Sequence, residues 1–136
     1  MDGTLGSGPR TIFLDTHVAV WLYADKRLVP DGVLSLIDTE ETFISPMAAV
    51  ETEYLHEIGR IAVDSRTILA ALNESIGLRM EERHLARALL AARDLKWTRD
   101  PFDRIIVAHA EAMRATLVTR DSTVLQHCRL ARWVPA

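Results

Sequence analysis

The chain has 136 residues, 49% of them apolar and 26% charged, and a formal net charge of −3. These values are typical of one soluble globular domain that is large enough to form a core. They exclude a membrane span, because no apolar run approaches about 20 residues, and the single Cys128 excludes an internal disulfide or a cysteine-based zinc cluster.

The first ten residues differ in composition from the rest of the chain. They contain three glycines and lack the apolar region of a secretory signal. We therefore expect a flexible leader at 1–10, a single domain at 11–136 and a cytoplasmic location.

Along the domain, short strand-like runs alternate with helical patterns. Val18, Trp21 and Leu22 recur at helical spacing, Pro46 suits the first turn of a helix, and Gly59 suits a helix end. Strands are expected at 12–15, 42–45, 75–79, 116–119 and, at an edge, 130–134; helices are expected at 16–24, from Pro30, from Pro46 to Gly59, after Asp64, and at 81–94, 100–114 and 122–128. This alternation predicts an α/β fold with a mainly parallel sheet.

Five acidic residues stand where strands end or helices begin. They are Asp15, Glu51, Asp100, Asp103 and Asp121. Because a parallel sheet gathers the carboxyl ends of its strands along one edge, we expect these carboxylates to meet there. Clustered carboxylate oxygens are the ligands that Mg²⁺ or Mn²⁺ prefers, so the sequence predicts a metal site.

Each acid also has a purely structural interpretation. Asp15, Asp100 and Asp121 suit helix N-caps, and Thr16 could share the cap at the first helix. Asp100 with Pro101 suits a cap, which leaves Asp103 in the first turn as the predicted ligand. We expect Glu51 rather than Glu53 to face the site, since residues two apart on a helix point about 200° apart.

Other catalytic patterns are weak or absent. The five histidines are scattered without a His-Glu-x-x-His spacing, and neither a Gly-x-Ser-x-Gly elbow nor a glycine-rich nucleotide loop occurs. Fourteen of the sixteen basic residues are arginine, which matches phosphate geometry, although codon composition explains this bias as well.

Four segments, taken together, resemble the PIN domain, and within it the VapC-type toxins of bacterial toxin–antitoxin pairs. They are Phe13 to Trp21, Ser45 to Glu51 with Gly59 to Ile61, Arg99 to Ala110, and Thr116 to Asp121. The Asp-Pro-Phe-Asp-Arg run at 100–104 is the most specific match and indicates a subgroup of the family. The motif order agrees with the family from about residue 11 to 134.

This resemblance implies a PIN-like three-layer α/β/α sandwich with four to five strands in a mainly parallel sheet. It also implies an Mg²⁺- or Mn²⁺-dependent ribonuclease that hydrolyses RNA phosphodiester bonds and leaves a 5′-phosphate and a 3′-hydroxyl. The family's acidic quartet falls on Asp15, Glu51, Asp103 and Asp121, which are therefore the predicted catalytic and metal-binding residues. Asp100, Thr119 and Thr16 are predicted in secondary roles, and Arg104 and Arg120 as contacts to RNA phosphates. Leu55 departs from the subgroup, which often has lysine there.

The resemblance further implies a VapB-type antitoxin that neutralises the chain, and a homodimer. We expect a partner helix to use apolar surface on the first two helices, at Val20, Trp21, Leu34 and Leu36, and a partner arginine to enter the acidic pocket. Two alternatives stay open. A catalytically idle PIN-like interaction module would not need the intact quartet. A phosphoacceptor receiver domain would need an acidic pair directly after the first strand and a lysine after a late strand, but Asp15 stands alone and neither Lys26 nor Lys96 follows a late strand.

Overall fold

The computed structural model describes residues 10–136. Most of the predicted leader, residues 1–9, lies outside the described residues. The described chain alternates strands and helices in the order β2 Thr11–Leu14, α1 Thr16–Ala24, η1 Lys26–Leu28, α2 Asp31–Thr39, β3 Glu41–Ile44, α3 Pro46–Glu57, α4 Ser65–Ile76, β4 Arg79–Met80, α5 Leu85–Ala91, η2 Ala92–Asp94, α6 Pro101–Ala112, β5 Thr116–Val118, α7 Ser122–His127 and β6 Ala131–Arg132.

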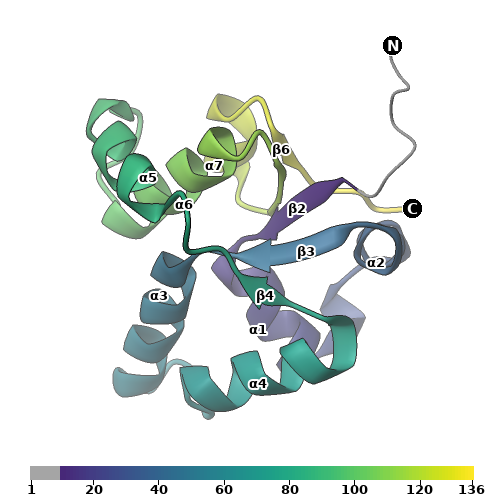
Figure 1. The fold of residues 1–136 in the computed structure, drawn as a ribbon. Coiled ribbons are helices and arrows are strands. Elements are labelled where there is room, and N and C mark those ends of the chain that lie inside the picture. Colours follow the sequence, from purple (N-terminus) through teal and green to yellow (C-terminus); the bar gives the residue numbers. More distant parts are fainter. Residues whose placement is uncertain (1–9) are drawn as a thin grey trace.

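The five strands form one sheet in the order β4-β3-β2-β5-β6, and every pairing is parallel. Helices α1, α3 and α4 lie on one side of the sheet, and α5, α6 and α7 on the other (Figure 1). The predicted three-layer α/β/α fold with a mainly parallel sheet of four to five strands is confirmed. Within the sheet, β3 lies next to one edge of β2, and β5 lies next to the other edge. The strand order therefore reverses between β2 and β5, and α/β proteins bind ligands at the carboxyl ends of the strands at such a switch point.

The core is centred on β2, which is covered on both faces. Phe13 and Leu14 are completely buried, as are Leu117 and Val118 on the neighbouring β5. Such unbroken apolar strands are typical of a parallel sheet between two helical layers. The central strands end at Leu14 and Val118, so Asp15 and Thr119 follow directly on the buried backbone of β2 and β5.

Two of the predicted elements were wrong. The third strand was expected at 75–79, but α4 continues to Ile76, Gly77 ends it with a positive φ of 70°, and β4 begins only at Arg79. The helix expected at 81–94 begins at Leu85 and changes to a 3₁₀ turn at Ala92. The glycine at 77 marks the end of α4, whereas the late start of α5 accompanies a buried tertiary contact of Glu81 that helical periodicity does not record.

That contact is a buried polar network around His109 of α6. The Nε2 atom of His109 lies 2.6 Å from Oε1 of Glu81, and its Nδ1 lies 2.9 Å from the Ser45 hydroxyl. Ser45 in turn caps α3 by accepting the Met47 amide hydrogen at 3.2 Å. The network therefore joins the segment after β4 to α6 and to the start of α3.

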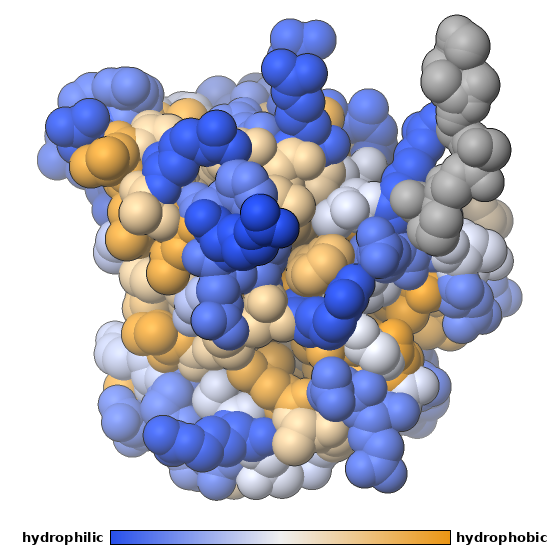
Figure 2. Space-filling model, viewed as in Figure 1, coloured by the Kyte–Doolittle hydropathy of each residue, from blue (hydrophilic) through white to orange (hydrophobic). Residues whose placement is uncertain are grey.

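The apolar side chains predicted to contact a partner are only partly exposed, and other apolar side chains are more exposed. Val20, Trp21, Leu34 and Leu36 are half-buried, and the last three pack against the core. More exposed apolar side chains are Val50 and Tyr54 on α3 and Ile58 directly after it. Figure 2, in the same view as Figure 1, shows hydrophobic surface on the side where α3, α4 and α5 lie. Within residues 10–136, no helix combines the length and apolar character needed to cross a bilayer.

Candidate active site

Three of the predicted acids cap helices that start at the carboxyl edge of the sheet. Asp15 follows β2 directly and accepts the Thr16 amide hydrogen at 2.8 Å at the start of α1. Asp100 caps α6 through the amides of Phe102 and Asp103, and Asp121 caps α7 through the amides of Thr123 and Val124. The N-cap interpretation of these acids is confirmed, and each helix start also carries partial positive charge that favours a carboxylate.

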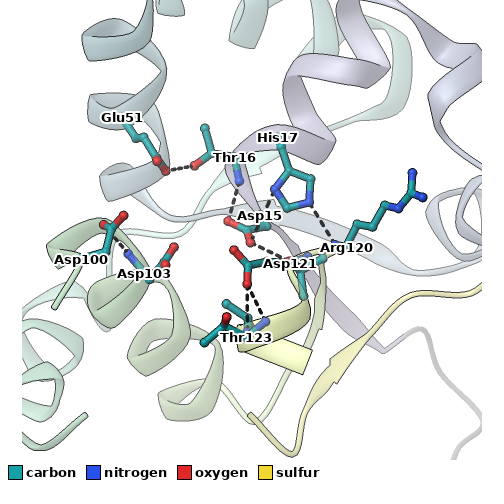
Figure 3. A network of polar contacts seen from close by, with 11 residues as sticks. Asp15, Thr16, His17, Glu51, Asp100, Asp103, Arg120, Asp121 and Thr123 are labelled. Atoms are coloured by element: carbon teal, nitrogen blue, oxygen red, sulfur yellow. Dashed lines mark hydrogen bonds and ion pairs between the residues drawn. The ribbon is translucent and has the colours of Figure 1, made fainter. Parts of the chain in front are cut away.

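The capping acids also meet around one hollow, so the structural interpretation does not exclude a functional one. This acidic hollow has a volume of about 180 Å³ and is lined by Asp15, Thr16, His17, Glu51, Leu55, Asp100, Asp103 and Asp121. Four segments supply the carboxylates that face a common space, namely those of Glu51, Asp100, Asp103, Asp15 and Asp121 (Figure 3). All five predicted acids are therefore brought together at the switch point.

Hydroxyl groups hold two of these carboxylates in place. The Thr16 hydroxyl donates to Oε1 of Glu51 at 2.5 Å and ties α1 to α3. The Thr119 hydroxyl, at the end of β5, donates to Oδ2 of Asp15 at 2.7 Å and accepts the Asp121 amide hydrogen at 3.0 Å. Thr16 and Thr119, predicted in secondary roles, thus orient Asp15 and Glu51.

The shared negative charge changes the acidity of two members of the hollow. Burial, followed by the charges of Asp100, Asp15, Asp121 and Glu51, raises the pKa of Asp103 to about 7. Burial also raises the pKa of Glu51, against the lowering effect of the Thr16 hydrogen bond and together with the charges of Asp15 and Asp100. Carboxylates that repel one another in this way gain most from a cation placed between them.

The donor set fits a hard divalent cation. Four Asp and one Glu supply carboxylate oxygens, and cysteine is absent from the lining. Across residues 10–136, no three His, Cys, Asp or Glu side chains already converge in an arrangement that could hold a metal ion. Asp15, Glu51 and Asp121 each commit an oxygen to a hydroxyl or amide group, and like charges keep the carboxylates apart. Mg²⁺ keeps several of its waters and needs few protein ligands, so bridging waters can span this spacing.

The two predicted phosphate contacts lie in different places. Arg120 adjoins the acidic hollow, and its backbone amide donates to Nε2 of His17 at 3.0 Å. Arg104 is not among the residues lining the acidic hollow, and its guanidinium donates to the Thr98 carbonyl oxygen at 2.7 Å. The geometry thus offers Arg120, and not Arg104, to a substrate at the acids. The imidazole of His17, which was not among the residues predicted for the site, lines the hollow with its Nδ1 atom 3.8 Å from Asp15 Oδ2.

A larger hollow lies between α3 and α4. It has a volume of about 510 Å³, and apolar side chains such as Val50, Tyr54, Leu69, Met80 and Phe102 dominate its lining. We call it the apolar hollow. Its lining includes Val50 and Phe102, the chain neighbours of Glu51 and Asp103, so it adjoins the acidic hollow without sharing its chemistry.

Comparisons with known proteins agree with this arrangement. The family model of the PIN domain matches residues 12–130. Among solved structures, the chain is similar to one in VapBC2 from Rickettsia felis, crystallised with a DNA fragment from the promoter, at 18% identity and a TM-score of 0.65, covering 91% of this chain and 98% of that one. It is also similar to a chain of FitAcB from Neisseria gonorrhoeae, at 18% identity and a TM-score of 0.55, covering 91% and 97%. A search of curated proteins found no significant match.

Proposed function

Since the chain belongs to the PIN domain family, we propose that it is a divalent-metal-dependent endoribonuclease, the toxin of a toxin–antitoxin pair. The observation that carries this proposal is the meeting of five carboxylates from four segments at the switch point of the sheet. A structural module would need the capping acids but would have no use for Glu51 and Asp103 in the same hollow. The PIN match and the lone acid after β2 leave the receiver alternative without support.

Asp15, Glu51, Asp103 and Asp121 are the proposed ligands of Mg²⁺ or Mn²⁺, directly or through water. When bound, such an ion polarises a phosphodiester and lowers the pKa of a bound water. The chain's own residues prepare the place: Thr16 and Thr119 hold Glu51 and Asp15, and the amides at the starts of α1 and α7 hold Asp15 and Asp121. Asp100 lies outside the quartet that the family resemblance implies, so we assign it a supporting role as the cap of α6.

The deciding experiment compares two neighbouring acids. We expect Asp103→Asn to reduce RNA cleavage in Mn²⁺ by at least about 100-fold, since removing a transition-state interaction of several kcal/mol has this effect. Asp100→Asn keeps its cap, because asparagine caps helices as well as aspartate does, and should lose far less activity. Both variants should fold, as judged by circular dichroism.

Thermal unfolding supplies a second measurement that does not depend on substrate. Millimolar Mn²⁺ should raise the melting temperature of the natural chain, because a ligand that binds only the folded state stabilises it, and it should raise that of Asp103→Asn much less. Absence of both cleavage and a thermal shift would leave the idle interaction module as the better explanation.

The proposed partner is a small antitoxin of the VapB type, and the apolar hollow is the surface that supports this. A partner helix in the apolar hollow would lie beside Val50 and Phe102, so a basic side chain one turn away could reach Glu51 or Asp103. Such a charge would compete with the metal and silence the enzyme. We further propose a homodimer and a cytoplasmic location, as for VapC-type toxins.

A further inference from the structure

A second small hollow adjoins the acidic one but has different chemistry. It has a volume of about 330 Å³ and is lined by His17, Trp21, Arg120 and Asp121. We call it the aromatic hollow. His17 and Asp121 line both hollows, so a chain that lies across the acids can continue directly into the second one. Figure 3 shows His17 and Arg120 on the far side of Asp15 and Asp121 from Asp100 and Asp103.

The aromatic wall of this hollow is fixed before any ligand arrives. The rings of His17 and Trp21 are 4.9 Å apart, and Trp133 packs edge-on against Trp21 at 6.1 Å. The backbone amide of Arg120 donates to Nε2 of His17, which places the proton of the neutral imidazole on Nδ1, on the side of Asp15. Two rings from α1 thus contact Trp133, just after β6, and the segment after β5.

The arginine of this hollow is not paired with an acid in a salt bridge among the described residues. Arg120 is exposed, and its side chain has no salt bridge within residues 10–136. A guanidinium matches the geometry of a phosphate, and an indole face accepts an unpaired base of any sequence by stacking. An aromatic face and an arginine beside a carboxylate cluster together suit one nucleotide of a single strand.

We propose that the aromatic hollow binds the nucleotide next to the phosphodiester held at the acids, with its base on Trp21 and its phosphate at Arg120. This inference rests on the proposed function for its substrate, single-stranded RNA. A base that pairs in a duplex cannot stack on Trp21, so the hollow favours unpaired RNA over a double strand.

The first test follows the three indole N–H signals in NMR spectra while adenosine 5′-monophosphate is added in the absence of metal. The signal of Trp21 should shift, whereas that of Trp97, which stacks on His127 outside this hollow, should not. A shift confined to Trp97, or no shift at all, would overturn the proposal.

The second test measures binding of a fluorescent single-stranded octanucleotide of RNA in the Asp103→Asn background, which leaves it uncut. Trp21→Leu should weaken binding at least about fivefold, the lower end of the effect of removing a base-stacking ring, and Trp21→Phe should restore most of it. Trp97→Leu is the matched control for loss of a half-buried tryptophan. Arg120→Gln should weaken binding and reduce its salt dependence, whereas Arg129→Gln, outside the hollow, should not.

The two proposals can fail separately. If the natural chain cuts RNA but folded Trp21→Leu and Arg120→Gln bind the oligonucleotide as well as the parent, the aromatic hollow is not a subsite while the nuclease stands. If the natural chain cuts no RNA with Mn²⁺ but adenosine 5′-monophosphate shifts Trp21, the nuclease proposal fails while the nucleotide site stands.

Discussion

At the scale of single residues, Asp103 carries a proton in much of the metal-free protein near neutral pH, because its pKa is raised to about 7. Its ordinary value is 3.8, so between about pH 4 and 7 the folded state holds a proton that the unfolded state releases. The resulting stability is fully present below the unfolded pKa and is lost as the pH rises through the folded pKa.

We therefore expect the metal-free protein to lose part of its free energy of unfolding between pH 5 and 8. Asp103→Asn should remove most of this loss, because asparagine does not ionise. Urea denaturation at both pH values in a chelator measures the difference, and Asp38→Asn on α2 serves as the control. An equal loss in the parent and in Asp103→Asn would show that Asp103 titrates without affecting folding.

Arg114 is a second informative residue, because its backbone conformation is one that glycine usually adopts. It has a φ of 50° after α6, and the amides of Ala115 and Arg114 bond back to Ala110 and Glu111 in the pattern of a Schellman motif. Gly59 takes the equivalent place after α3 with a φ of 78°. Glycine adopts this left-handed conformation freely, whereas residues with a Cβ are strained in it.

Arg114→Gly should therefore raise the free energy of unfolding by about 1 kcal/mol. Gly59→Ala should lower it by a similar amount, since an added Cβ would meet nothing within 4 Å and only the backbone strain would act. Chemical denaturation of both variants gives the two values. Opposite signs are required; a destabilised Arg114→Gly would mean that the arginine side chain contributes more than the strain costs.

At the scale of elements, the network of Glu81, His109 and Ser45 connects the two helices that carry Glu51 and Asp103. Burial alone would raise the pKa of Glu81, but hydrogen bonds from His109 and His84 outweigh burial and lower it to about 2. Because this folded pKa is depressed, the stability it contributes is present above about pH 4.5 and is lost as the pH falls toward 2.

Glu81→Gln should destabilise the protein at pH 7 by about 1–3 kcal/mol, the usual cost of leaving a buried partner poorly satisfied. The difference from the parent should shrink between pH 4.5 and 2. Denaturation over this range measures it, with the exposed neighbour Glu82→Gln as the control. A constant difference at every pH would indicate a packing effect in place of a charge effect.

At the scale of the whole molecule, the apolar hollow is a surface that a partner could cover. Tyr54 on α3 lines it and is exposed to solvent. We expect the chain, when co-produced with the small protein encoded beside it, to form a stable complex that does not cut RNA. Tyr54→Glu should weaken that complex at least about tenfold, the effect of losing a well-packed aromatic contact, whereas Leu28→Glu on the exposed turn η1 should not.

Light scattering and RNA cleavage assays on the purified species check this expectation. Full activity within a stable complex would count against silencing by the partner. A free chain that stays monomeric at high concentration would count against the homodimer.

The residue types along the sequence were sufficient to predict most of the helices and strands and to name the acids of the candidate site. Pro46, Gly59 and the capping acids mark helix ends because their backbone preferences act over a few residues, and apolar strands between helices require a parallel sheet. Parallel strands and the helices that follow them begin at one edge of the sheet, which is why acids at strand ends and helix starts, namely Asp15, Glu51, Asp100, Asp103 and Asp121, could be named in advance.

Tertiary structure alone decided how those residues interact. The raised pKa of Asp103 depends on burial and on charges far away in the chain, and the alignment of His17, Trp21 and Arg120 depends on β5 lying beside β2. Glu81 lies outside α5 and bonds instead to His109, 28 residues away in the chain. Electrostatic and packing energies act through space, whereas a sequence pattern records only what neighbours along the chain prefer.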